Sequence, residues 1–288
     1  MIRNPVARNL ILAFLLLLSF YCAISPVVAM PLYDKMLFFP TKQFETDFDN
    51  LAGFAKEDST FTSANGSKLH AWYIPVPHSR GTVIISHGNA GNISYRVPLM
   101  ELFLKQKLSV LAYDYQGYGK SEGTPSIDHV CEDGLAAYDF LTEERGVESK
   151  KIIVYGESLG GGVASYIAAN RKVEAIILQS AFSSLPHIAR LKMPLMRFYP
   201  NFFFPKNCMD SASLLSVEHA PLLIVHGEND TIIPVSEAHK LFDAAVEPKK
   251  LVTIENANHN DMYGSQYEAS LSSAIVDFLQ TIAAFKVN

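Results

Sequence analysis

Residues 151–160 of the chain read KIIVYGESLG, and residues 161–170 continue as GGVASYIAAN. The apolar, β-branched start of this stretch predicts a buried strand, and the Ala- and Gly-rich continuation predicts a helix. Gly156 and Gly160 enclose Ser158 as G-x-S-x-G where the strand meets the helix. The glycines suit a strained turn in which neighbours with a Cβ would collide with the adjacent strand and helix. This pattern is typical of a nucleophile elbow and makes Ser158 the candidate nucleophile.

Length and composition favour one large α/β domain. The chain has 288 residues, and no linker rich in Pro, Gly or Ser divides it. The formal charge of −5 and the scattered Lys and Arg residues exclude nucleic acid as an expected partner. The three cysteines, Cys22, Cys131 and Cys208, lack metal-ligand spacing. We expect Cys131 and Cys208 to be buried free thiols, with a disulfide between them as the alternative.

The N-terminal segment, residues 1–33, carries a membrane signal. Residues 10–30 are almost wholly apolar, which is about the length needed to cross a hydrocarbon core of roughly 30 Å. Arg3 and Arg8 precede this run, which predicts a single-helix anchor with the catalytic domain on the non-cytoplasmic side. The alternative is a signal peptide cleaved near Ala29, which would leave the domain secreted or periplasmic.

The remaining chain, residues 34–288, predicts a mostly parallel sheet with helices on both faces. Residues 60–63 and 69–76 predict a hairpin around Asn65-Gly66, which would form an antiparallel N-terminal edge. Apolar strands then alternate with helical periodicity. The expected strands are residues 82–86, 109–113, 152–155, 175–179, 222–226 and 251–254, and the expected helices are residues 95–106, 127–144, 161–170, 235–245 and 266–285. Residues 182–215, rich in aromatic residues and prolines, interrupt this alternation and predict a small cap insertion.

A serine hydroxyl becomes a strong nucleophile when a base takes its proton and an acid orients that base. Asp230 follows the strand at residues 222–226, and His259 follows the strand at residues 251–254. Both should therefore lie beside Ser158 at the carboxyl edge of the sheet. The chain order Ser158, Asp230, His259 is that of elbow-type hydrolases.

Other residues compete for these two roles. Glu228 and Asp261 are alternative acids, and Asp230 could instead cap the helix that begins near Pro234. Among the other histidines, His226 closes a strand and is expected to be packed and hydrogen-bonded. His87 is expected to be a scaffold residue rather than a catalyst.

Donors for an oxyanion are expected from two loops. Residues 87–92, HGNAGN, follow the strand at residues 82–86, where elbow-type hydrolases place their oxyanion loop. The backbone N–H of Asn89 should therefore pair with that of Leu159. A phosphate-binding loop is the alternative, but these residues lack both the Lys-Ser/Thr ending and the G-x-G-x-x-G spacing.

These motifs resemble the α/β-hydrolase superfamily, and more narrowly the membrane-tethered α/β-hydrolase-domain serine hydrolases related to the prolyl oligopeptidase branch. The resemblance covers nearly the whole chain from Asp34 onward. Its further marks are residues 36–40 (MLFFP), 69–75 (LHAWYIP) and 114–121 (DYQGYGKS). It implies structural roles for Asp114 and Ser121 and a retained N-terminal anchor. Gln116 departs from the arginine that the family usually carries.

We expect a serine hydrolase that cleaves carboxylic esters of small molecules or lipids through an acyl-enzyme on Ser158. The resemblance also admits thioesters and amides. A serine peptidase or aminoacyl amidase is one alternative, and a non-catalytic, membrane-attached binding module is another. No cofactor is expected, and no cluster of His, Cys or carboxylate residues indicates a metal.

Overall fold

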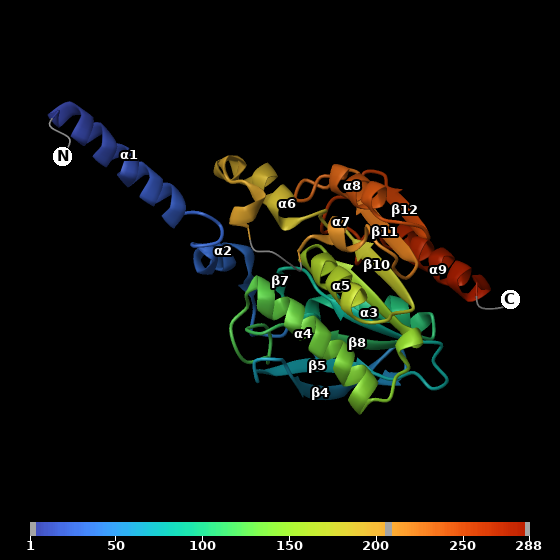
Figure 1. Ribbon diagram of the computed structural model, residues 1–288. Coiled ribbons are helices and arrows are strands. Elements are labelled where there is room, and N and C mark those ends of the chain that lie inside the picture. Colours follow the sequence, from blue (N-terminus) through green and yellow to red (C-terminus); the bar gives the residue numbers. More distant parts are fainter. Residues whose placement is uncertain (1–3, 205–208, 286–288) are drawn as a thin grey trace.

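The computed structural model describes residues 4–204 and 209–285, and a mixed sheet lies at its centre (Figure 1). The order of its eight strands is β12-β11-β10-β9-β6-β8-β5-β4. β5 is antiparallel to β4 and β8, and all other neighbours are parallel. The predicted parallel sheet with an antiparallel edge is confirmed. The strands are β4 (Glu57–Thr62), β5 (Lys68–Ile74), β6 (Thr82–Ser86), β8 (Ser109–Tyr113), β9 (Ile152–Glu157), β10 (Ala175–Gln179), β11 (Leu222–Gly227) and β12 (Lys249–Ile254).

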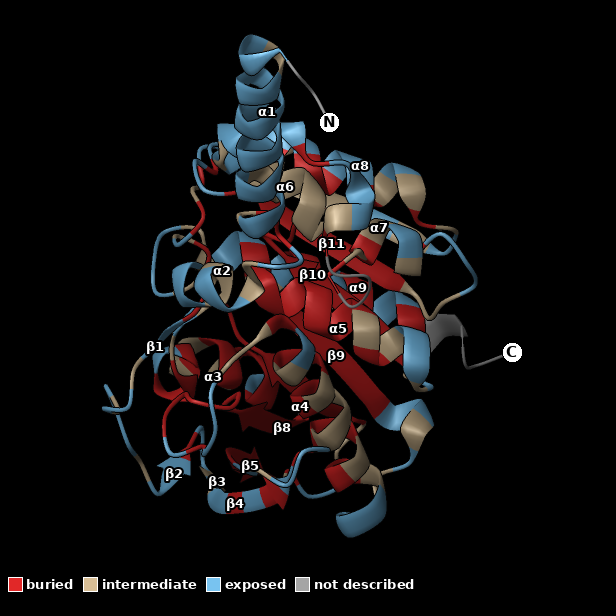
Figure 2. Ribbon diagram, turned by 60° about the vertical axis from the view of Figure 1, so that its left-hand side comes forward, coloured by how far each residue is buried: buried red, intermediate tan, exposed pale blue. Residues whose placement is uncertain are grey.

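Helices cover both faces of the sheet, as predicted. Val130, Val163 and Leu241 belong to the apolar core on one face, and Leu99 and Ile275 to the core on the other. The inner strands are buried on both sides (Figure 2), which explains their continuous apolar sequences. The first face carries α4 (Ile127–Asp139), which continues as the π-helical turn η2 (Phe140–Glu144), α5 (Leu159–Asn170) and α8 (Ser236–Ala244), and the second carries α3 (Val97–Lys105) and α9 (Glu268–Phe285).

A long apolar helix, α1 (Pro5–Ala23), projects from this body (Figure 1). It has 19 residues, a mean hydropathy of 1.9 and no buried residue, and among the described helices it is the one long and apolar enough to cross a membrane. The Asn4 side chain caps it by accepting a hydrogen bond from the Val6 N–H at 2.9 Å. The helix ends before Pro26, so it covers only part of the apolar run at residues 10–30.

The segment after α1 joins the domain. α2 (Met30–Leu37) is followed by β1 (Phe39–Pro40), which pairs in parallel with β7 (Ala90–Gly91) in the loop after β6. Sequence periodicity did not predict this small ladder, because two-residue strands leave no alternation to detect. Further short elements are β2 (Asn50–Leu51), β3 (Phe54–Ala55), η1 (Ile93–Arg96) and η3 (Ser149–Lys151).

Residues 182–204 and 209–215, the described part of the segment expected to be a cap insertion, form short helices between β10 and β11. Met196, Tyr199 and Phe204 are the buried centre of an apolar cluster in this cap. Tyr21, at the end of α1, packs into the same cluster. The described cap elements are α6 (Leu185–Lys192), η4 (Pro194–Phe198), η5 (Asn201–Phe203) and α7 (Ser211–Leu214).

The cysteine prediction needs one correction. Cys131 lies on α4 and is disulfide-bonded, so the expectation of a free thiol there is wrong. Cys208 lies outside the described residues. Cys22 is a free, exposed thiol on α1.

Candidate active site

Ser158 lies at a sharp turn between β9 and α5. Its φ of 54° and ψ of −115° are a strained combination for a residue with a side chain, at a cost of about 1–3 kcal/mol. A Cβ on Gly156 would lie 2.3 Å from the Gly160 carbonyl oxygen, and one on Gly160 would lie 2.0 Å from that of Ser86. The glycines of the motif are therefore required by the close packing of the turn against β6 and α5.

Ser158, His259 and Asp230 form one hydrogen-bonded chain. His259 Nε2 lies 3.1 Å from Ser158 Oγ, and His259 Nδ1 lies 2.6 Å from Asp230 Oδ2. The three side chains follow β9, β12 and β11, so the carboxyl edge of the sheet brings them together. This geometry allows His259 to take the Ser158 proton while Asp230 orients the imidazole ring.

The Asp230 carboxylate is held by several donors. Its Oδ1 accepts hydrogen bonds from the backbone N–H groups of Ile232 at 2.9 Å and Ile233 at 2.6 Å. Its Oδ2 also lies 3.3 Å from His226 Nε2. Burial acts to raise the pKa of Asp230, but the hydrogen bonds from His226, His259 and the backbone outweigh burial and hold this pKa well below its usual range. Asp230 therefore stays ionised beside His259 at neutral pH.

The alternative acids make other contacts. Glu228 is exposed and accepts a hydrogen bond from Thr253 Oγ1 at 2.8 Å. Asp261 accepts one from the backbone N–H of Asn258 at 3.0 Å. Within the described part of the chain, no hydrogen bond joins either carboxylate to His259. The geometry therefore favours Asp230 over both alternatives.

The expected oxyanion loop adjoins the elbow. The Asn89 carbonyl accepts hydrogen bonds from the Phe39 N–H at 2.9 Å and the Tyr118 hydroxyl at 2.6 Å. The Asn89 side chain donates to the Leu37 carbonyl at 2.7 Å. Among the described residues, no group of the protein accepts a hydrogen bond from the backbone N–H of Asn89 or of Leu159. Both amides are therefore free to donate to a substrate.

A buried ion pair behind the elbow was not found by sequence reasoning. Glu157, directly before Ser158, accepts hydrogen bonds from Arg96 at 3.0 and 3.1 Å and from the Tyr263 hydroxyl at 2.8 Å. Burial acts to raise the pKa of Glu157, but the charge of Arg96 outweighs it and lowers this pKa. Glu157 is the first variable residue of G-x-S-x-G. The motif does not indicate a partner for it, since Arg96 is 61 residues away in the sequence.

His87 and His226 occupy scaffold positions. The His87 ring is fully buried against Tyr115 and Tyr118, and its Nδ1 lies 2.7 Å from the Gly88 carbonyl oxygen. His226 Nε2 lies 2.8 Å from the Ile233 carbonyl oxygen, in the loop that carries Asp230. Both rings thus hold loops at the carboxyl edge of the sheet.

Gln116 holds the loop at residues 114–121 through hydrogen bonds of its side-chain amide. Gln116 Nε2 donates to Asp133 Oδ1 at 2.8 Å, and its Oε1 accepts from Asn65 Nδ2 at 2.8 Å. Burial raises the pKa of Asp133, since the hydrogen bonds from Gln116 and Ser63 only partly offset it. Asp114 and Ser121 serve the same scaffold, because Ser121 Oγ donates to the Asp114 carbonyl at 2.7 Å.

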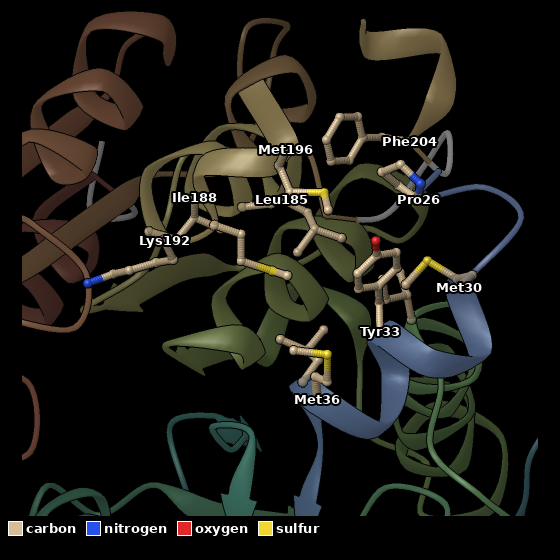
Figure 3. A pocket seen from close by; sticks show the side chains of 13 residues that line it. Pro26, Met30, Tyr33, Met36, Leu185, Ile188, Lys192, Met196 and Phe204 are labelled. Atoms are coloured by element: carbon tan, nitrogen blue, oxygen red, sulfur yellow. The ribbon is translucent and has the colours of Figure 1, made fainter. Parts of the chain in front are cut away.

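Two recesses of different polarity lie in the described part of the molecule. One reaches His259, has a volume of about 420 Å³ and is lined by polar side chains that include Tyr95, Glu157 and Gln179. The other is apolar, has a volume of about 340 Å³ and lies between α2 and α6 (Figure 3). No group of three or more His, Cys, Asp or Glu residues within the described ranges could hold a metal ion.

Comparison with known proteins places this architecture in a family. A family model described as "Serine aminopeptidase, S33" matches residues 77–216. An uncharacterised protein of Salmonella typhi, YfhR, is 30% identical, and the match covers 98% of this chain and 97% of that protein. An uncharacterised membrane protein of Saccharomyces cerevisiae is 30% identical over 80% of this chain and 84% of its own length.

Solved structures share the fold. An esterase of Pyrococcus furiosus superposes with a TM-score of 0.72 at 22% identity, and the match covers 85% of this chain and 98% of the esterase. The mostly parallel sheet with helices on both faces is the architecture that the chain shares with these structures. The chain therefore belongs to the α/β-hydrolase superfamily and is a hydrolase of the α/β type.

Proposed function

We propose that this hydrolase cleaves carboxylic esters through an acyl-enzyme on Ser158. The observation that carries the proposal is the hydrogen-bonded chain from Ser158 through His259 to Asp230, with Ser158 at a strained turn. A nucleophile, a base and an orienting acid in this geometry suit acyl transfer.

In the proposed first half-reaction, His259 Nε2 takes the proton of Ser158 as Oγ attacks the ester carbonyl carbon. The backbone N–H groups of Asn89 and Leu159 donate to the oxyanion of the tetrahedral intermediate. The bond between the carbonyl carbon and the alcohol oxygen then breaks, and His259 gives its proton to the departing alcohol. Asp230 stabilises the imidazolium that exists between these two proton transfers.

In the second half-reaction, His259 takes a proton from water, and the resulting hydroxide oxygen attacks the acyl carbon. The acyl–Oγ bond breaks, the carboxylic acid leaves, and Ser158 regains its proton from His259. The polar recess beside His259 supports this step, because it can hold both the departing alcohol and the incoming water.

The test uses the full chain in detergent with a short-chain p-nitrophenyl ester and a fluorophosphonate probe. Ser158→Ala should lower kcat by at least about 10³-fold and abolish labelling, while circular dichroism shows an intact fold. Ser165→Ala, on the helix α5 that follows Ser158, is the matched control and should keep both signals. A wild-type protein that neither turns over esters nor labels would favour the non-catalytic binding module.

The family description favours a second candidate, an aminopeptidase or aminoacyl amidase. Aminoacyl p-nitroanilides, assayed beside the esters, separate the two activities. A higher kcat/KM for the anilides would replace the ester proposal while leaving Ser158 as nucleophile. Thioesters in the same screen would extend the substrate class without changing the mechanism.

We also propose that α1 is a retained membrane anchor with the catalytic domain on the non-cytoplasmic side. Tyr21 on α1 stacks on Tyr199 of the cap at a centroid distance of 4.5 Å, and Tyr21 Oη donates to the Phe198 carbonyl at 2.7 Å. A cleaved signal peptide would remove these contacts. The mass of the mature chain and its extraction from membranes test this: cleavage near Ala29 with release by alkaline carbonate would establish the secreted alternative.

A further inference from the structure

The apolar recess between α2 and α6 is built mainly from two parts of the chain, with Ile127 at the start of α4 added. One wall comes from the segment after α1, and the other comes from the cap (Figure 3). Thioether and aliphatic side chains dominate the lining, chiefly Met30, Met36, Leu185, Ile188, Met193 and Met196. Methionine adapts to irregular apolar shapes, so such a recess suits a flexible hydrocarbon chain.

The recess adjoins the proposed reaction centre at two points. Leu37, which lines it, accepts a hydrogen bond from the Asn89 side chain at 2.7 Å. Lys192, at its edge, donates to the Thr231 carbonyl at 2.9 Å, next to Asp230. Met30, Leu37 and Ile188 also pack against the apolar core on the face of the sheet that carries α5, the helix after Ser158. Hydrogen bonds therefore link the recess lining to the loop of Asn89 and to the loop of Asp230, the two loops that border the elbow.

The recess also lies at the base of the membrane-spanning helix. Tyr33 lines it and donates to the Ile24 carbonyl at 2.7 Å, one residue past α1. Apolar side chains around this base are exposed, and Phe198 and Phe202 reach 71% exposure. The exposed set on the segment after α1 and on the cap is Val27, Val28, Leu32, Met36, Leu195, Phe198 and Phe202. Exposed apolar groups beside a membrane anchor are expected to contact lipid.

The second recess is more polar than the first and reaches His259. In the proposed mechanism, His259 gives its proton to the leaving group. Its polar lining includes Tyr95, Gln179 and Asn260. An apolar recess near the elbow and a polar recess at His259 together match an ester with an apolar acyl chain and a polar alcohol.

Resting on the ester hydrolase function above, we propose that the α2–α6 recess is an acyl-chain site for amphiphilic esters drawn from the membrane that α1 spans. The acyl chain lies between α2 and α6 with its carbonyl at Ser158, and the polar headgroup alcohol lies in the recess at His259. The anchor segment is then part of the substrate site as well as a tether.

The first experiment measures kcat/KM of the full chain in mixed micelles for p-nitrophenyl butanoate, octanoate, dodecanoate and hexadecanoate. Each buried methylene should raise kcat/KM by up to about fourfold until the recess is full. Ala189→Trp places a large side chain in the recess lining. It should lower the ratio of kcat/KM for dodecanoate to kcat/KM for butanoate at least about tenfold, because the indole fills space that the longer chain needs. The matched control, Ala169→Trp on the exposed face of α5, should keep the wild-type profile.

A second measurement does not depend on turnover. Ser158→Ala protein should bind a fluorescent long-chain fatty acid in micelles, and Ser158→Ala/Ala189→Trp should bind it at least about tenfold more weakly. If Ala189→Trp fails to fold, Ile188→Ala should weaken the same binding by widening the recess.

The outcomes separate the two proposals. Wild-type protein that labels with fluorophosphonate and cleaves butanoate, but shows a flat chain-length profile that Ala189→Trp does not change, would overturn the acyl site and keep the esterase. Absence of labelling and of all ester turnover would overturn the esterase itself. Fatty-acid binding that Ala189→Trp and Ile188→Ala leave unchanged would also overturn the acyl site.

Discussion

The side chain of Asn89 donates a 2.7 Å hydrogen bond to the backbone carbonyl of Leu37, the last residue of α2. This bond ties the loop after β6 to the segment that follows the apolar helix α1. The β1–β7 ladder and the hydrogen bond from Phe39 N–H to the Asn89 carbonyl tie the same two segments. The N-terminal segment therefore helps to fix the position of Asn89, whose backbone N–H we propose as an oxyanion donor.

Replacing Asn89 with Ala should slow the chemical step while leaving the proposed donor in place. The backbone N–H remains, but it loses its side-chain tether, and misplacement of a donor by an ångström can cost about 10²-fold. We expect kcat for a short ester to fall about 10–100-fold with little change in KM. Asn170→Ala removes an exposed side-chain bond at the end of α5 and is the matched control. A rise in KM of about 10–100-fold with an unchanged kcat would contradict this positioning role.

Replacing Asp230 with Asn should identify the acid. The amide keeps the size of the side chain but removes the charge that orients and stabilises the His259 imidazolium, so kcat should fall about 10⁴-fold, as in other Ser-His-Asp enzymes. Glu228→Gln and Asp261→Asn are isosteric controls and should stay within about threefold of wild type. A large loss in either control with an active Asp230→Asn would reassign the acid.

Much of this site was predictable because the chain encodes it locally. A strand, two glycines and a helix around Ser158 fix a turn, and parallel strands must end at the same edge of their sheet. Asp230 and His259 follow two such strands, so their meeting with Ser158 follows from topology. Even so, Glu228 and Asp261 lie in the same two loops, and only the hydrogen-bond geometry favours Asp230 over them.

The parts that sequence reasoning missed depend on long-range packing. Arg96, directly before α3, contacts Glu157, which lies 61 residues further along the chain. The β1–β7 ladder has too few residues for a periodic signal, and the stacking of Tyr21 on Tyr199 joins residues from opposite parts of the chain. A disulfide at Cys131 was expected only as the alternative to a free thiol, because spacing along the chain does not report distance in space.

Removing Arg96 should destabilise the fold more than removing the whole ion pair. Arg96→Leu leaves the Glu157 carboxylate buried without its main partner, which should cost about 3–5 kcal/mol of unfolding free energy. Arg96→Leu/Glu157→Leu should recover most of this loss, because an apolar pair of similar volume needs no charge compensation. Denaturant unfolding in detergent measures both variants. If the double variant is no more stable than Arg96→Leu, the loss of unfolding free energy comes from other contacts of these side chains and not from the unpaired carboxylate.

The same pair should make stability depend on acid pH. The pKa of Glu157 is lowered in the folded protein, against about 4.3 for an unfolded glutamate. Its contribution is therefore fully present above about pH 4.3 and is lost as pH falls through the folded pKa. Glu157→Gln should destabilise the protein most at neutral pH, and the difference in unfolding free energy from wild type should shrink as pH falls below about 4. Unfolding of both proteins from pH 7 to pH 3 measures this difference, and Glu228→Gln, an exposed glutamate, is the control. A difference that stays constant over this range would show that Glu157 carries no lowered pKa.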